Sequence, residues 1–123
     1  MYAPVLRAHA SDPKNRGPLE TANAWGEASY APCGDSFSLS LRLEGERLAE
    51  VHFEAKACGP VVALGSLATE ILRGVTIQEA LSFDSFYWDK AAGGLPPAKR
   101  HAILLLLEAL HNALNSEPST GGT

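Results

Sequence analysis

Four side chains of types that bind metal ions fall where predicted elements of secondary structure meet. Cys33 and Asp35 share one loop, and Gly34 between them permits a sharp bend. Cys58 lies just before a predicted helix, whose free N-terminal N–H groups and dipole favour a thiolate. His101 lies in the early part of the last predicted helix. Two thiolates, one imidazole and one carboxylate make a complete tetrahedral ligand set for zinc, so these residues are candidate metal ligands.

The spacing also leaves a structural role open for each candidate, because the chain has no Cys-x-x-Cys pair. Cys58 suits a small buried filler, and Asp35 suits a turn cap. Cys33 suits an inert loop thiol, and His101 suits a solvated helix position. Nothing in the spacing assigns a ligand role to the other three histidines, His9, His52 and His111.

The strands are predicted from apolar residues that alternate with polar ones. Alternation over 36–43 and again over 50–56 has the period of two that is typical of half-buried strands. The turn at 44–46 between them predicts an antiparallel hairpin. A weaker strand pattern covers 23–30, and a short helix is predicted over 2–10.

The remaining helices are predicted from their start and stop signals. Pro60 suits the first position of a helix, and Gly74 suits its end. Residues 76–79 have the spacing of a capping box and open a short helix, whereas 82–94 are predicted to be a loop. We predict that the last helix starts at Pro96 and runs to about residue 115. The predicted fold class is α+β, a small antiparallel sheet with helices packed on one face.

The whole chain has 123 residues, of which 46% are hydrophobic and 20% are charged, as expected for one globular domain. We predict this domain over 1–115 and a disordered polar tail over 116–123. The net charge of -4 and the scattered basic residues argue against nucleic-acid binding, and no apolar run reaches the length of a membrane span. The N-terminus lacks a signal-peptide pattern, so we predict a cytoplasmic protein whose two cysteines are free thiols or ligands.

Several short motifs occur together in a fixed order. They are His9 with Pro13 and Asn15, then Cys33-Gly34-Asp35, then Cys58-Gly59, then Leu95-Pro96-Pro97-Ala98-Lys99 with His101. With these motifs colinear over roughly residues 5–115, the chain resembles the IscU/NifU N-terminal family of iron–sulfur cluster assembly scaffolds. The short stretch between Leu81 and Leu95 is similar to the IscU branch of that family.

The resemblance implies a function, a cargo and partners. It implies that Cys33 and Cys58 are ligands of iron or a [2Fe–2S] cluster, that Asp35 tunes cluster lability, and that His101 lies at the site. A cysteine desulfurase is the implied sulfur donor. An Hsp70-type chaperone is the implied partner of the segment that contains Leu95, Pro96, Pro97 and Lys99, which we predict to be exposed. The two prolines fit equally well a structural role as simple punctuation of the helix start.

One position departs from the family pattern, in which a third cysteine directly follows the histidine. Here that residue is Ala102, which neither ligates metal nor accepts sulfur. Three hypotheses follow: a scaffold or carrier that holds a [2Fe–2S] cluster, a zinc-binding member with the same ligands, or a degenerate paralogue that regulates the assembly machinery. No nucleophile–base pair and no phosphate loop stands out, so we do not predict an independent enzyme.

Overall fold

The computed structural model describes residues 2–115, apart from the side chain of Cys33. Within this range, three strands and five α-helices form an α+β fold, which confirms the predicted fold class. The disordered tail predicted over 116–123 lies outside the described residues.

The sheet has the strand order β1-β2-β3, and both neighbouring pairs are antiparallel. Its strands are β1 (Ala24–Tyr30), β2 (Asp35–Glu44) and β3 (Arg47–Lys56), so the predicted hairpin and the weaker first strand are both confirmed. Phe37, Leu39 and Leu41 of β2 face the core and are each at most 2% exposed. Burying one such side chain contributes about 1.5–3 kcal/mol, so the alternation of the sequence decides which face points inward.

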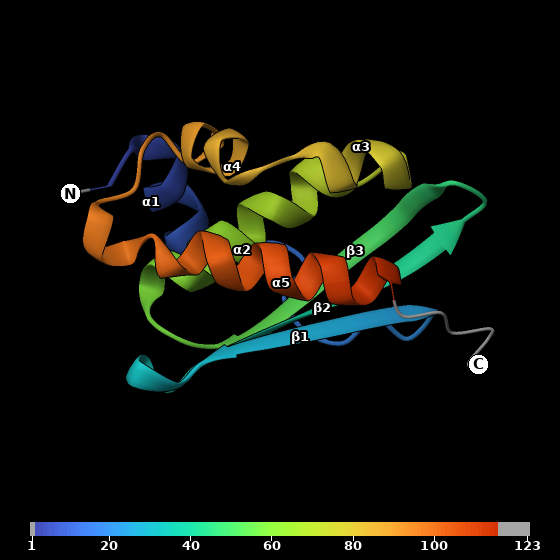
Figure 1. Ribbon diagram of the computed structural model, residues 1–123, viewed down its shortest axis with the longest axis horizontal. Helices are drawn as coiled ribbons and strands as arrows, with labels where there is room; N and C mark the ends of the chain where they lie inside the picture. Colours follow the sequence, from blue (N-terminus) through green and yellow to red (C-terminus); the bar gives the residue numbers. More distant parts are fainter. Residues whose placement is uncertain (1, 116–123) are drawn as a thin grey trace.

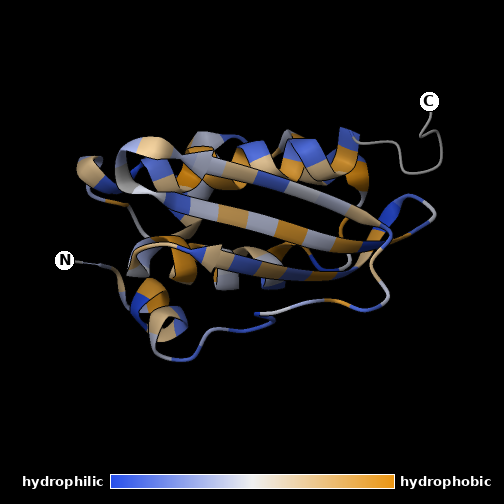
Figure 2. Ribbon diagram, turned by 90° about the horizontal axis from the view of Figure 1, so that it is seen from below, coloured by the Kyte–Doolittle hydropathy of each residue, from blue (hydrophilic) through white to orange (hydrophobic). Residues whose placement is uncertain are grey.

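The helices cover one face of this sheet (Figure 1). α2 contacts β3, α5 contacts β1 and β2, and α1 packs against α2. Figure 2 shows the strands in front of the helices, with no helix of residues 2–115 covering the outer face of the sheet. The bounds are α1 (Pro4–Ser11), α2 (Gly59–Leu72), α3 (Ile77–Ser82), α4 (Ser85–Ala91) and α5 (His101–Asn115).

The packing of α5 on β1 depends on a glycine in the strand. A Cβ atom added at Gly26 would lie 2.1 Å from the carbonyl oxygen of Ala109 and 2.3 Å from the backbone nitrogen of Ala113. Both atoms belong to the backbone of α5 and have no flexible end that moves aside. The absence of a side chain at Gly26 therefore sets how closely the helix approaches the sheet.

The loop predicted over 82–94 is wrong, because this stretch contains α4. The Asp84 side chain caps the helix by accepting the Tyr87 N–H at 2.9 Å, and Trp88 is fully buried. The helix has only seven residues, too few for a clear apolar period.

The start predicted for the last helix is also wrong. Residues Pro97–Lys99 form the separate 3₁₀ turn η2, and α5 begins at His101.

The segment from Leu95 to Lys99, predicted to be exposed, is only partly so. Leu95 is 4% exposed and belongs to the core, whereas Pro97 and Ala98 are exposed. Asp89 of α4 holds this segment, since its carboxylate accepts the Leu95 N–H at 2.9 Å. The prediction of exposure is therefore wrong for Leu95, whose apolar side chain is more stable in the core than in water.

The N-terminal segment crosses the outer face of the sheet from β3 to β1. Gly17 and Asn15 exchange backbone hydrogen bonds with Phe53 of β3, and Asn23 bonds both backbone groups of Leu43.

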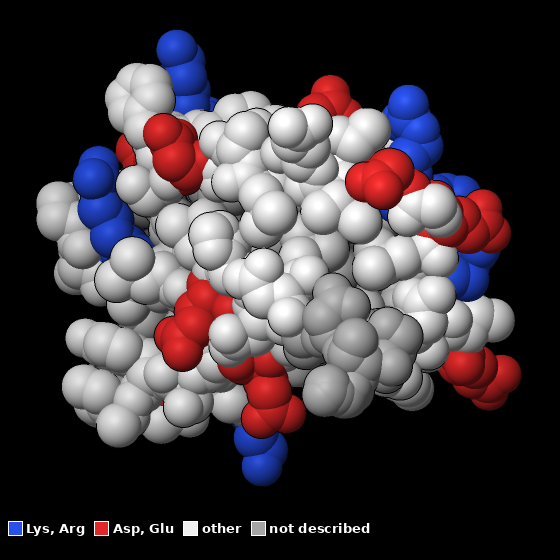
Figure 3. All heavy atoms as spheres, turned by 45° about the vertical axis from the view of Figure 1, so that its right-hand side comes forward, with Lys and Arg blue, Asp and Glu red and all other residues white. Residues whose placement is uncertain are grey.

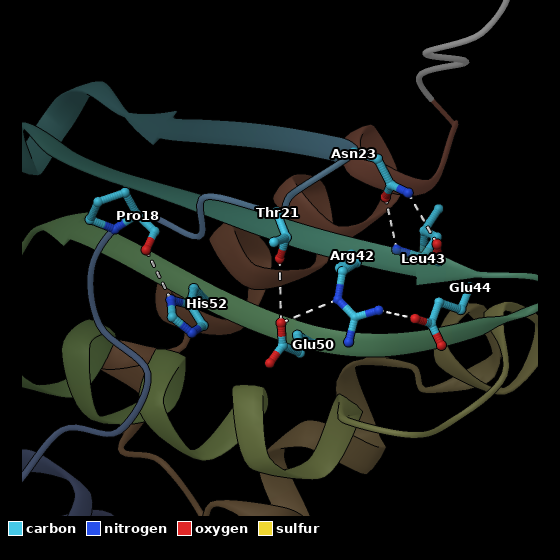
Figure 4. Close-up of polar contacts among 8 residues, drawn as sticks. All are labelled: Pro18, Thr21, Asn23, Arg42, Leu43, Glu44, Glu50 and His52. Atoms are coloured by element: carbon cyan, nitrogen blue, oxygen red, sulfur yellow. Dashed lines mark hydrogen bonds and ion pairs between the residues drawn. The ribbon is translucent and has the colours of Figure 1, made fainter.

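Between these two anchors, Thr21 and Arg42 both donate to the Glu50 carboxylate, and Arg42 also pairs with Glu44 (Figure 4). The hydrogen bonds from Arg42 and Thr21 lower the pKa of Glu50. This polar network holds the segment against β2 and β3.

Charged side chains of both signs are scattered on the face in Figure 3, with no continuous basic patch. Among residues 2–115, no helix is long and apolar enough to span a bilayer.

Candidate metal centre

The candidate ligands come from three elements that begin at the same end of the molecule. Asp35 is the first residue of β2, Cys58 is the N-cap of α2, and His101 is the first residue of α5. The β1–β2 turn and the starts of α2 and α5 lie together at the left of Figure 1. Residues separated by up to 66 positions in the sequence are thereby brought to one place.

Asp35 stands between the other two side chains. Its Oδ2 atom accepts the Nε2–H of His101 at 3.0 Å and lies 3.9 Å from the Cys58 sulfur. One donor atom from each of the three residues lies within 4.8 Å of the others. No other group of three such donors occurs among the residues that the structure describes.

These separations fit a single metal ion after a small shift. A sulfur at about 2.3 Å and a nitrogen at about 2.1 Å from a tetrahedral metal lie about 3.6 Å apart. The donor atoms here are at most 4.8 Å apart, so a shift of about 1 Å suffices.

The surroundings of the site are dry and favour negative charge. The side chains of Asp35 and His101 are 7% and 10% exposed. The N-termini of α2 and α5 both direct partial positive charge toward this end of the molecule. Anionic ligands such as thiolates, carboxylates and sulfide are stabilised by such an arrangement, and low exposure strengthens each interaction.

Cys33 lies in the turn that leads into Asp35. Ala31–Cys33 form the 3₁₀ turn η1, which ends at Gly34 in the left-handed conformation with φ of 69°. A left-handed residue is least strained as glycine, which accounts for Gly34 between the two candidate ligands. The backbone of Cys33 is therefore close to the site, while its side chain is not among the described ones.

A further side chain at the site, Tyr30, was not predicted from the sequence. Its ring stacks on the His101 imidazole, with centroids 4.7 Å apart and planes 17° apart. Tyr30 is the last residue of β1 and pairs with Asp35 across the ladder. The only sequence signal was an aromatic residue at the strand end next to the Cys-Gly-Asp loop.

The other histidines lie apart from this group. His9 is buried on α1, where its Nδ1 atom lies 2.6 Å from the Ser66 hydroxyl oxygen. His52 donates from Nδ1 to the carbonyl of Pro18 at 3.2 Å, and His111 is exposed on α5. Neither His9 nor His52 has a cysteine among its described hydrogen-bond and ion-pair contacts.

Ala102, which occupies the position of the family's third cysteine, is 1% exposed and packs in the core. His101 also lines a groove, together with Tyr30 and the exposed side chains of Phe86 and Leu104.

Comparisons with known proteins agree with this architecture. The chain matches the model of the family described as "NifU-like N terminal domain" over residues 1–119. It is 37% identical over 115 residues to the iron–sulfur cluster assembly scaffold protein IscU of Aquifex aeolicus, covering 92% of this chain and 73% of the relative. It is 32% identical over 114 residues to IscU 1 of Archaeoglobus fulgidus, covering 93% and 74%.

The fold also matches a solved structure. A crystal structure from Fervidobacterium islandicum, described as an assembly scaffold for the SUF system, superposes with a TM-score of 0.76. That match covers 93% of this chain and 96% of the other, at 21% sequence identity, so it bears on the fold alone.

Proposed function

The chain belongs to the family of NifU-like N-terminal domains, and we propose that it acts as a scaffold-like protein that holds iron or a [2Fe–2S] cluster as cargo. In this proposal the ligands are Cys33, Asp35, Cys58 and His101. Relatives that cover most of its length are named iron–sulfur cluster assembly scaffolds. The protein serves assembly by holding cargo and is not itself an enzyme.

One observation carries the proposal, the convergence of Asp35, Cys58 and His101 within 4.8 Å at the starts of two helices. A [2Fe–2S] cluster needs four protein ligands, and histidine replaces cysteine in some such clusters. In this proposal Cys33 supplies the fourth ligand, in addition to Asp35, Cys58 and His101.

The single carboxylate is the hard member of an otherwise softer set, so it binds cluster iron less tightly than a thiolate. Asp35 therefore makes the site suited to releasing its cargo.

Two partners follow from the proposed role. A cysteine desulfurase supplies sulfur, and an Hsp70-type chaperone engages the segment ending at Lys99. Because Leu95 is buried, we propose that Pro97 and Ala98, which are exposed, make the contact with the chaperone.

Zinc is the second candidate cargo, and the geometry of the three donors supports it. Three donor atoms around one point suit one tetrahedral ion with a fourth ligand from Cys33 or water. The replacement of the third thiol by Ala102 favours zinc further, because a smaller thiolate set stabilises a cluster less.

Anaerobic reconstitution with ferrous iron and sulfide tests the proposal. The visible absorbance and the bound iron and sulfide are measured for the parent, for Cys58→Ser and for His111→Ala, an exposed histidine of α5 outside the site, and bound zinc is measured after a parallel incubation with zinc alone. We expect cluster in the parent and control and little in Cys58→Ser. If the parent binds zinc but builds no cluster, zinc is the cargo. If it binds neither, the proposal fails and a regulatory role without metal is favoured.

A further inference from the structure

The last residue pair of the β1–β2 ladder holds one imidazole from two directions. Tyr30 and Asp35 lie directly opposite each other in the register. The Asp35 carboxylate accepts the Nε2–H of His101 in the plane of the ring, and Tyr30 covers one face of the same ring at 4.7 Å. Both contacts therefore come from the two strand ends that flank the turn containing Cys33.

Two such contacts restrict the imidazole more than either alone. A hydrogen bond to Nε2 fixes one atom but leaves the ring free to turn about that axis. A stacked aromatic ring fixes the plane, because offset stacking favours nearly parallel rings, and these planes differ by 17°. A metal ion that displaces the proton from Nε2 binds along the direction of that N–H bond, so the orientation of the ring decides where the ion is bound.

We propose that Tyr30 is a positioning residue for the metal site, acting through the His101 ring; this rests on the proposed function. The aromatic ring face of Tyr30 orients His101. Its hydroxyl group forms no hydrogen bond among the described residues of the site. The side chain is half-buried, so its replacement exposes one face of His101 to water.

The β1 strand offers a matched control. Trp25 is an aromatic residue of the same strand, is 58% exposed and pairs with Ser40, five positions from Tyr30. Replacing Trp25 by Leu removes an aromatic ring from β1 without touching His101. This control separates the effect of removing any aromatic side chain from β1 from the effect of removing the ring that stacks on His101.

The test is a titration with Co²⁺ alone, whose absorption reports both occupancy and ligand geometry. Partners that orient a metal-bound histidine typically contribute 10–100-fold to affinity, and we expect about tenfold weaker Co²⁺ binding in Tyr30→Leu. Tyr30→Phe keeps the ring and should bind as the parent does, as should Trp25→Leu. At saturation, Tyr30→Leu should also show an altered ligand-field spectrum, which a general loss of stability does not produce.

A double variant separates positioning from stability. If Tyr30 acts through His101, adding Tyr30→Leu to His101→Ala causes no further loss of Co²⁺ affinity. A full further tenfold loss in the double variant would overturn the inference, as would unchanged binding by Tyr30→Leu. If the parent itself does not bind Co²⁺, the proposed function fails instead.

A measurement without metal covers the case in which Tyr30→Leu does not fold. In the metal-free parent, proton NMR should show nuclear Overhauser contacts between the Tyr30 ring and the His101 ring. The Tyr30→Phe variant should keep them. Their absence in the folded parent would contradict the stack on which the inference depends.

Discussion

His9 and His101 have equally buried side chains, each 10% exposed, and each faces a carboxylate. The nitrogen–oxygen distance is 3.0 Å from His101 to Asp35 and 3.5 Å from His9 to Glu70. Burial and a carboxylate partner therefore do not distinguish a candidate ligand from a structural histidine.

The difference lies in the other neighbours of each ring. His101 has the Cys58 thiol within 4.8 Å, whereas His9 contacts the hydroxyl of Ser66, which also accepts the Lys14 N–H at 2.6 Å. The cluster around His9 joins α1 and the following segment to α2 by hydrogen bonds. The nearby soft sulfur donor makes His101 a candidate ligand. The contact with a hydroxyl group instead makes His9 a structural histidine.

The largest effect that tests this comparison is expected from His101→Ala. Loss of a ligand should weaken zinc binding by at least about 100-fold, beyond the 10–100-fold typical of an outer partner. His9→Ala should leave zinc affinity unchanged. Competition with a chelator of known affinity measures both variants. Equal losses in the two variants would show that burial, and not the donor set, decides the role.

Ala102→Cys sharpens the same comparison by adding a soft donor next to His101. The new thiol should raise cluster occupancy severalfold after anaerobic reconstitution, because thiolates favour Fe–S clusters. Ala102 is 1% exposed, so the extra atom costs about 1–3 kcal/mol of stability if the site does not adjust. Equally high occupancy in parent and variant, judged by iron and sulfide content, would mean that the parent already has a full ligand set.

His9→Ala is expected to act on stability alone. It removes one of the two partners of the fully buried Ser66 hydroxyl, which keeps the Lys14 N–H, and a buried group left partly unsatisfied costs about 1–3 kcal/mol. Chemical denaturation should show this loss. His111→Ala, at an exposed position, should change the free energy of unfolding by less than about 0.5 kcal/mol. A loss below that value for His9→Ala would contradict a structural role.

The smallest effect is expected from Glu70→Gln. The Glu70 side chain is half exposed, and its contact with His9 is long, at 3.5 Å. Exposed ion pairs contribute about 0–1 kcal/mol, so the change in unfolding free energy should stay below about 0.5 kcal/mol. A loss near 2 kcal/mol would place Glu70 inside the structural cluster and not at its edge.

The sheet and most helices were predictable because local patterns specify them. The alternation of 36–43 and 50–56 follows the period of a half-buried strand, and the capping box of Thr76 and Glu79 forms as its spacing indicates. α4 was not predicted because a seven-residue helix relies on the Asp84 cap and on burial of Trp88, which is a tertiary contact.

The candidate residues of the site were predictable from their chemical types, but their contacts were not. Asp35, Cys58 and His101 were candidates because of their chemistry and their positions next to predicted elements. The stack of Tyr30 on His101 joins residues 71 positions apart and has no local signature. The burial of Leu95 likewise depends on Asp89 of α4, a helix missing from the predicted elements.

X-ray absorption spectroscopy of the zinc-loaded protein tests the central claim most directly, that Asp35, Cys58 and His101 form one metal site. The account predicts a sulfur shell near ~2.3 Å together with nitrogen or oxygen near ~2.0–2.1 Å, and loss of the imidazole contribution in His101→Ala. A shell of light atoms alone, without sulfur, would contradict it.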